Sequence, residues 1–163
     1  MKVMAENVLI KRWKGKMLEA CQNGETKVVE LLLERCNSEE SGLNTKDQKG
    51  WTVVMDACYN GHKDVVKLLL GHPDPKIDLN ARDIYGQNAF MAACYNGRKD
   101  VVELLLEHAN PNIELNAIDY KANTAFMLAC EQGHTNLVKF FFDKVMLGLD
   151  ITVPDFGLFQ PGV

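Results

Sequence analysis

Four cysteines of this 163-residue chain recur at nearly equal intervals, which bears on whether they bind a metal or form disulfides. Cys58, Cys94 and Cys130 lie 36 residues apart, and Cys21 precedes Cys58 by 37 residues. If each interval is one structural repeat, equivalent cysteines lie on packed helices about 8–10 Å apart. A disulfide needs Cα atoms about 4.4–6.8 Å apart, and a metal ion needs thiolates within about 2.3 Å. We therefore expect buried structural thiols, with Cys36 as a free thiol in a loop.

The histidines and carboxylates show the same repetition. His62 and His134 are matched by Arg98, a side chain that binds no metal. Asp56 occupies a position that the other copies fill with Glu19, Ala92 and Leu128, and this mixture predicts a partly exposed edge rather than a catalytic carboxylate pair. The chain has no phosphate-binding loop, nucleophile elbow or zinc-finger spacing. The sequence predicts no enzyme, no metal and no cofactor.

One basic cluster stands out in a chain whose net charge is −4. Its bases surround Trp13 and are Lys11, Arg12, Lys14 and Lys16. Such a cluster can bind phosphate or an acidic partner. It can also be the solvated face of a segment whose Val8, Leu9 and Trp13 cover the first repeat. Capping is the favoured interpretation, because the ends of a repeat stack need a polar outer face.

Composition excludes several classes of protein. With 47% hydrophobic and 25% charged residues, the chain is neither disordered, collagenous nor a coiled coil. Its apolar runs fall far short of the roughly 18 residues of a membrane-spanning helix, and its N-terminus lacks a secretory apolar region. We expect an intracellular protein, cytoplasmic or nuclear, without a membrane partner.

The cysteine spacing belongs to a repeat that covers most of the chain. YNGHKDVVKLLL from Tyr59 returns as YNGRKDVVELLL from Tyr95 and more loosely as EQGHTNLVKFFF from Glu131, and QNGETKVVELLL begins at Gln22. In one copy, an apolar run at 53–58 ends at Gly61, and a second helix carries its apolar stripe at 65–70. An extended stretch at 77–80 and a turn at 83–86 follow. No copy can bury its apolar face alone, so the copies must stack into a solenoid.

These motifs resemble the ankyrin repeat family. The matching residues of the second copy are Asp47, Gly50, Thr52, Ala57, Cys58, Gly61, His62, Val65 to Leu70, Leu79, Asn80, Ala81 and Asp83. The resemblance implies an all-α solenoid of stacked helix-turn-helix repeats with β-hairpin loops, here with a 36-residue period where the family's unit is about 33. We expect a capping segment at 1–16, repeats at 17–47, 48–83, 84–119 and 120–155, and a further partial repeat or tail at 156–163.

The chain departs from the family in its helix starts and in its last copy. TVVM at 52, NAFM at 88 and TAFM at 124 replace the family's T-P-L-H, so the usual Thr–His hydrogen bonds cannot form. The last copy carries Phe140 to Phe142, Ala122 in place of a glycine, and Thr152 in place of an asparagine. This Phe-rich copy could pair with a second chain, although a monomer is expected.

Tyrosines gather where the family's concave surface contacts partners. Hairpin tips and first-helix ends hold all four tyrosines and Trp51, and these side chains offer large, rigid contact area with a polar handle. The alternative is that Tyr59 and Tyr95 pack only on neighbouring repeats. The partner-binding residues that we expect are Gln48, Lys49, Trp51, Tyr59, Asn60, Ile84, Tyr85, Gln87, Tyr95, Asn96, Tyr120, Lys121, Asn123, Glu131 and Gln132.

Asn44, Asn80 and Asn116 precede the hairpin turns. In the ankyrin family, asparagine at this place usually hydrogen-bonds the turn and is sometimes hydroxylated at Cβ in animal cells. The structural use is the favoured one.

The sequence therefore predicts a non-catalytic protein-binding scaffold or adaptor. The alternative is a targeting or regulatory region of a larger enzyme or signalling protein, since the chain stops at Val163, where another repeat would begin. A nucleic-acid-associated regulator that uses Lys11 to Lys16 ranks last.

Overall fold

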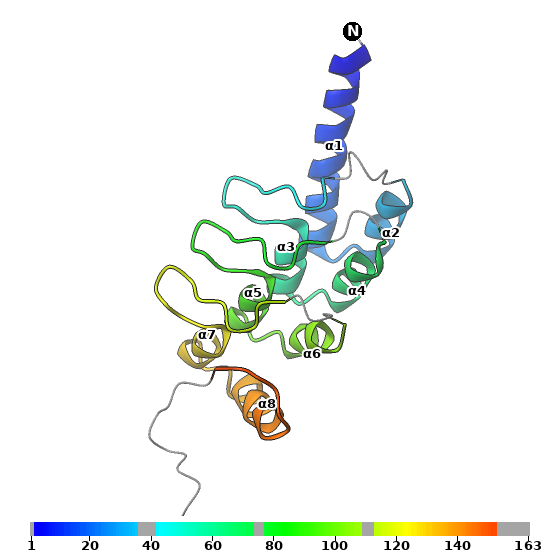
Figure 1. The fold of residues 1–163 in the computed structure, drawn as a ribbon. Coiled ribbons are helices and arrows are strands. Elements are labelled where there is room, and N and C mark those ends of the chain that lie inside the picture. Colours follow the sequence, from blue (N-terminus) through cyan, green and yellow to red (C-terminus); the bar gives the residue numbers. More distant parts are fainter. Residues whose placement is uncertain (1, 36–41, 74–76, 109–112, 153–163) are drawn as a thin grey trace, which may run out of the picture.

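The computed structural model describes residues 2–35, 42–73, 77–108 and 113–152, with backbone alone for residues 2–10. In these residues the chain forms eight helices and no strand (Figure 1). The helices are α1 (Lys2–Asn23), α2 (Thr26–Glu34), α3 (Val53–Asn60), α4 (Lys63–Gly71), α5 (Ala89–Tyr95), α6 (Lys99–His108), α7 (Ala125–Glu131) and α8 (Thr135–Met146).

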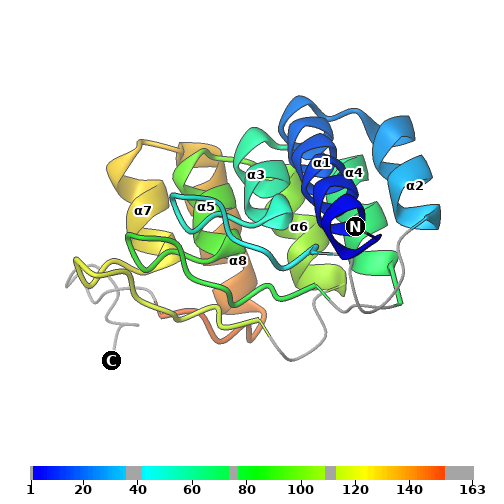
Figure 2. The same ribbon diagram turned by 90° about the horizontal axis from the view of Figure 1, so that it is seen from above.

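Consecutive helices pair, and the pairs stack into a solenoid. α1, α3, α5 and α7 follow one another in an inner row, while α2, α4 and α6 form an outer row beside it (Figures 1 and 2). The loops that enter α3, α5 and α7 project side by side from one side of the stack (Figure 1). The predicted all-helical solenoid is confirmed.

Local sequence explains where these helices begin and end. α3 stops at Gly61, whose φ of 81° lies in the left-handed region and lets its N–H reach the carbonyl oxygens of Ala57 and Cys58. α5 and α7 begin at Asn88 and Thr124, whose side-chain oxygens accept hydrogen bonds from the N–H groups of Met91 at 2.9 Å and Met127 at 3.3 Å. These caps serve two repeats that lack the family's Thr–His pair.

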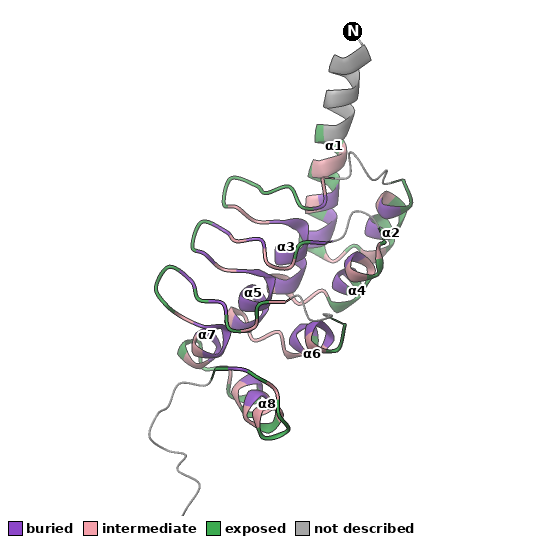
Figure 3. Ribbon diagram, in the orientation of Figure 1, coloured by how far each residue is buried: buried purple, intermediate pink, exposed green. Residues whose placement is uncertain are grey.

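One continuous core runs through all the repeats, from Met17 to Ile151 (Figure 3). Phe141 is fully buried, and its ring centroid lies 6.2 Å from that of Phe90 and 6.0 Å from that of Phe126. Phe140 and Phe142 pack on the core edge and are only partly buried. No repeat could form this core alone, so stability depends on stacking.

The recurring cysteines lie within this core. Cys21, Cys58 and Cys94 are buried, Cys130 is partly buried, and all four are free thiols. Burial raises the pKa of the Cys21 thiol to about 12 and raises the pKa of the Cys58 thiol further. These thiols stay protonated at neutral pH and act as small packing groups. Cys36 lies outside the described residues.

The structure differs from two expectations, one about the loops and one about where the first repeat begins. The expected β-hairpin loops contain no strand in the described residues, because each loop closes within a few residues, as in the hydrogen bond from the Asp47 N–H to the Trp51 carbonyl oxygen at 2.8 Å. The expected division between residues 16 and 17 falls inside α1, which runs unbroken from Lys2 to Asn23. The segment 156–163 lies outside the described residues.

The last hairpin turn carries an alanine in a conformation that favours glycine. Gly50, Gly86 and Ala122 occupy the same place and have φ values of 77°, 79° and 63°. A Cβ at Gly50 would lie 2.9 Å from the Cα of Asp83 in the next hairpin. Alanine at 122 therefore carries backbone strain, whereas alanine at 50 would add a clash between repeats.

We expect Ala122→Gly to stabilise the protein by about 0.5–1 kcal/mol, since relief of strain outweighs the added freedom of the unfolded chain. The matched substitution Gly50→Ala should destabilise it by more than about 1 kcal/mol. Urea unfolding monitored by circular dichroism measures both. Equal effects of the two substitutions in the same direction would contradict the assignment of backbone strain to Ala122.

Candidate functional site

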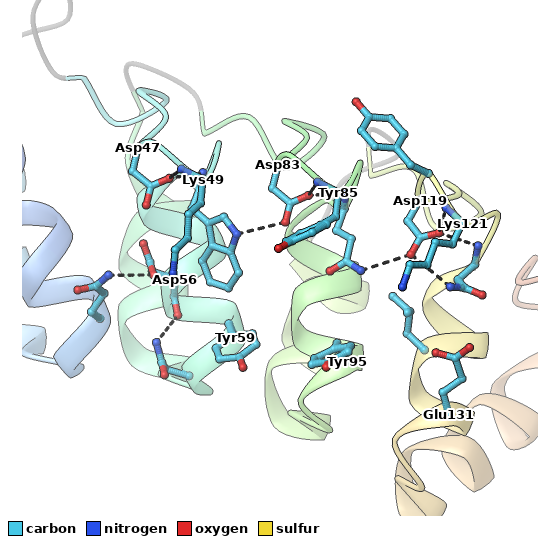
Figure 4. A pocket seen from close by; sticks show the side chains of 17 residues that line it. Asp47, Lys49, Asp56, Tyr59, Asp83, Tyr85, Tyr95, Asp119, Lys121 and Glu131 are labelled. Carbon is cyan, nitrogen blue, oxygen red and sulfur yellow. Dashed lines mark hydrogen bonds between the residues drawn. The ribbon is translucent and has the colours of Figure 1, made fainter.

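A groove of about 740 Å³ runs along the inner helices beneath the projecting hairpins (Figure 4). Residues from every repeat contribute to it, so it exists only in the stacked solenoid. We call it the tyrosine groove. Its lining residues are Gln22, Asp47, Lys49, Trp51, Asp56, Tyr59, Asn60, Asp83, Tyr85, Gln87, Tyr95, Asp119, Tyr120, Lys121, Asn123, Leu128 and Glu131.

The hairpins above the groove are built around three equivalent aspartates. Oδ1 of Asp83 accepts hydrogen bonds from the N–H groups of Tyr85 and Gln87, both at 2.8 Å, and Asp47 and Asp119 do the same in their own turns. A carboxylate that accepts two backbone N–H bonds fixes the turn tightly. Each hairpin is thereby rigid before any partner arrives.

The same aspartates tie neighbouring hairpins together. Trp51 Nε1 donates to Oδ2 of Asp83 at 3.1 Å, and Gln87 Nε2 donates to Oδ2 of Asp119 at 3.4 Å. Burial acts to raise the pKa of Asp119, but hydrogen bonds from Asn123, Lys121 and Gln87 outweigh it and lower the pKa. Asp119 is therefore an ionised structural acceptor.

Backbone hydrogen bonds join the hairpin tips as well. The Ile84 N–H donates to the Lys49 carbonyl oxygen at 3.0 Å, and the Tyr120 N–H donates to the Tyr85 carbonyl oxygen at 2.9 Å. Backbone hydrogen bonds therefore connect the three hairpin tips above the groove.

Three aromatic rings form one wall of the groove. Trp51 and Tyr59 meet edge to face with ring centroids 5.1 Å apart, and the rings of Tyr59 and Tyr95 stack at 6.4 Å with 18° between their planes. Tyr59 and Tyr95 occupy equivalent positions at the ends of α3 and α5, so the helix spacing sets the ring spacing (Figure 4). They contact one another and also line the groove.

Asp56 was expected at a partly exposed edge, and this expectation is wrong. The residue is only 4% exposed, because the inner helices α1 and α5 pack on both sides of α3. Oδ1 accepts a hydrogen bond from Gln22 Nε2 at 3.2 Å, whereas Oδ2 is buried without a hydrogen-bond partner in the described residues. Burial raises the pKa of Asp56 to about 6, a shift that Asp47 increases and that Gln22 and Lys49 oppose.

The basic side chains between the paired helices bind backbone, not a ligand. Nε2 of His62 donates to the Gln22 carbonyl oxygen at 2.8 Å, and Nε2 of His134 donates to the Tyr95 carbonyl oxygen at 2.8 Å. Arg98 Nε donates to the Tyr59 carbonyl oxygen at 3.0 Å in the repeat between them. The three side chains satisfy the carbonyl groups at the end of the preceding inner helix.

Most of the expected partner-binding residues line the tyrosine groove, and four do not. Gln48 and Ile84 are exposed at hairpin tips, and Gln132 is exposed just beyond α7. Asn96 instead donates from Nδ2 to the Tyr59 carbonyl oxygen at 2.9 Å. The groove residues that sequence reasoning did not select are Gln22, Asp47, Asp56, Asp83, Asp119 and Leu128. These residues recur at hairpin starts and inner-helix positions, and this recurrence could have predicted that they line the groove.

The three asparagines bind the next repeat. Oδ1 of Asn44, Asn80 and Asn116 accepts the backbone N–H of Asp78 at 2.8 Å, Glu114 at 2.9 Å and Thr152 at 2.7 Å, respectively. These bonds extend across the repeat boundary. Such bonds hold successive extended segments in register.

The basic cluster lies on α1, away from the groove. Lys11, Arg12 and Lys16 are exposed, Lys14 is partly buried, and Trp13 packs against the core. α1 extends beyond the rest of the stack (Figure 1). Val8 and Leu9, the other expected capping side chains, lie outside the described side chains.

The described part of the chain contains no group of three or more His, Cys, Asp or Glu residues that could hold a metal ion. Among the described residues, no helix combines the length and apolar character that crossing a membrane requires.

Comparison with known proteins identifies the repeat. A family model described as "Ankyrin repeats (3 copies)" matches residues 16–83 and 76–155. No curated protein matches the chain significantly.

We expect Asp56→Asn to stabilise the protein at neutral pH, because it removes a charge that the fold desolvates. The folded-state pKa of Asp56 lies above its ordinary value of 3.8, so its stabilising contribution is present at low pH and is lost as the pH rises through about 6. The advantage of the variant should grow by roughly 1–3 kcal/mol from about pH 4 to about pH 7.

Urea unfolding of both proteins across this pH range measures the effect. Glu131→Gln, at an exposed carboxylate of the same groove, is the matched control and should show a much smaller change. An advantage of Asp56→Asn that is constant with pH would refute the assignment of a buried, titrating carboxylate.

Proposed function

The chain belongs to the ankyrin repeat family, whose repeats form protein-interaction modules, and we propose that this one binds a protein partner through the tyrosine groove. In this proposal the module acts without catalysis, as a scaffold or adaptor. The main support for this proposal is the aromatic wall of the groove. It consists of Trp51 from a hairpin and of Tyr59 and Tyr95 from the ends of the inner helices α3 and α5.

Aromatic rings with polar tips are the side chains that protein interfaces concentrate. Hydrogen bonds to Asp47 and Asp83 hold Trp51 in place before binding, and the helix spacing holds Tyr59 and Tyr95, which reduces the entropy lost when a partner docks. The groove is therefore preorganised.

A second cavity between α2 and α4 offers a weaker alternative. It measures about 660 Å³, and its charged lining includes Glu30, Glu34, Asp64 and Lys67. No Trp, Tyr or Phe lines it. Because charged residues are depleted at interface centres and aromatic residues are enriched there, the tyrosine groove is the better candidate.

The groove does not favour nucleic acid as its occupant. Five carboxylates line it against two lysines, and phosphate groups would meet net negative charge there. Nucleic-acid binding would have to use Lys11, Arg12 and Lys16 on α1, which is a separate surface. A role as a regulatory region of a larger protein uses the same groove and the same contacts.

Hydroxylation of Asn44, Asn80 and Asn116 stays a separate proposal. Asn44 and Asn116 are exposed, which supports access by a modifying enzyme. Intact-mass measurement on protein from its native cells tests it, since each hydroxylation adds the mass of one oxygen atom.

We expect the triple substitution of Tyr59, Tyr85 and Tyr95 by alanine to abolish partner capture from a cell extract. Tyr85 is 60% exposed, so Tyr85→Ala alone should weaken capture while leaving the melting temperature unchanged. Quantitative mass spectrometry of captured proteins measures both, and circular dichroism checks that the variants fold.

Lys63→Ala with Lys67→Ala, on the exposed side of α4, is the control and should capture the same proteins as the wild type. If a folded triple variant still retains those proteins, the groove is not the binding surface.

A further inference from the structure

The tyrosine groove contains a carboxylate that the fold uses only in part. Asp56 is 4% exposed, one of its oxygens binds Gln22, and the other has no hydrogen-bond partner in the described structure. A buried polar atom that is left unsatisfied costs about 1–3 kcal/mol, and an ionised one costs more. Such an atom in a groove can be satisfied by a donor from outside the chain.

The repeat register shows that the solenoid does not need a carboxylate here. The equivalent positions of the next two repeats hold Ala92 and Leu128, both buried in the same row of inner helices. Those repeats stack without any polar group at this place. Repeat packing therefore gives no reason for Asp56.

The charge around Asp56 fits a cation. The charged residues that line the groove are Asp47, Asp56, Asp83, Asp119 and Glu131 against Lys49 and Lys121. Lys49 reaches from its hairpin toward Asp56 (Figure 4), and its charge lowers the pKa of that carboxyl. Lys49 is exposed, so a ligand cation can displace it and take its place beside Asp56.

The neighbouring rings narrow the kind of cation. Trp51 packs on Tyr59, which lies about one helical turn after Asp56 in α3, and Tyr95 continues the stack. A guanidinium group can place its flat face on such rings while its edge donates to a carboxylate, whereas an ammonium group cannot do both as well. The combination of a buried acceptor and an aromatic wall suits arginine.

We propose that the groove recognises a partner segment through one arginine side chain, whose guanidinium donates to the free oxygen of Asp56 and lies against the Trp51–Tyr59 pair. This inference rests on the proposed function, and it assigns the chemistry of the partner. The other side chains of the segment follow the groove along Tyr95 and the hairpins.

The test begins with a random twelve-residue peptide library selected on the immobilised full chain. We expect enriched peptides to share one arginine at a fixed position. A synthetic enriched peptide is then compared with two versions that carry citrulline or lysine at that position. Citrulline keeps the shape of arginine without its charge.

Replacing arginine by citrulline should weaken binding to the wild type by about tenfold or more, as expected for a buried charge pair. Lysine should bind with intermediate affinity. With Asp56→Asn, the citrulline and arginine peptides should bind almost equally, because the coupled carboxylate is gone. Asp100→Asn, at an exposed carboxylate of α6 that does not line the groove, is the control and should keep the full preference for arginine.

The pH dependence provides a second readout that a purely structural role would not change. Protonation of Asp56 competes with the cation, so wild-type affinity for the arginine peptide should fall as the pH drops through about 6. The Asp56→Asn protein should lose this pH dependence. The charged neighbours Asp47 and Lys49 are unchanged in both proteins.

The outcomes separate this inference from the proposed function. Peptides that lose binding with Tyr59→Ala and Tyr95→Ala but contain no shared arginine would leave the groove as the binding site and overturn the arginine assignment. A preference for arginine that Asp56→Asn leaves intact also overturns it. Peptides that bind equally well to the tyrosine variants would overturn both proposals.

Discussion

The hydrogen bonds between successive repeats are the constraint on which the rest of the structure depends. A single helix pair cannot bury its apolar face, so each repeat is stable only against its neighbours. Asparagine, histidine or arginine, and aspartate side chains each extend from one repeat to the next, as with Asn80 to the Glu114 N–H and Trp51 to Asp83. The apolar core supplies free energy along the stack, and these directional bonds fix the register.

That register brings equivalent residues of successive repeats together in the tyrosine groove. Stacking places the ends of α3 and α5 side by side, which brings Tyr59 and Tyr95 to a ring spacing of 6.4 Å. Backbone hydrogen bonds between neighbouring hairpins connect the tips above this wall. Asp56 is a buried carboxylate at a position that Ala92 and Leu128 fill in the next two repeats, and its burial opposes stability at neutral pH. The solenoid can tolerate a buried carboxylate in one repeat, because the next two repeats bury apolar side chains at this position and the free energy of stacking is shared among all repeats.

Much of the fold could be predicted from the sequence. The apolar run at 53–58 and Gly61 gave the bounds of α3, and the stripe at 65–70 gave the buried face of α4. The tyrosines of the groove could be found because repeat register converts equal spacing into spatial proximity. The burial of Asp56 could not be predicted from the sequence, because the equivalent positions of the other repeats hold both charged and apolar residues. Its burial depends on how closely α1 and α5 pack against α3. The loops were expected to form β-hairpins, yet too few residues pair for any strand to form in the described segments.

The sequence by itself determined the period, the helix pairs and the order of the repeats, because these follow from apolar spacing and turn residues that act over a few positions. The tertiary structure alone decided which polar side chains lie between repeats and which remain without a partner. Asn96 and Tyr95 are neighbours in sequence, yet Asn96 binds the preceding repeat while Tyr95 lines the groove. Distances across a repeat boundary settle this difference, since a hydrogen bond depends on a few tenths of an ångström that no local pattern specifies.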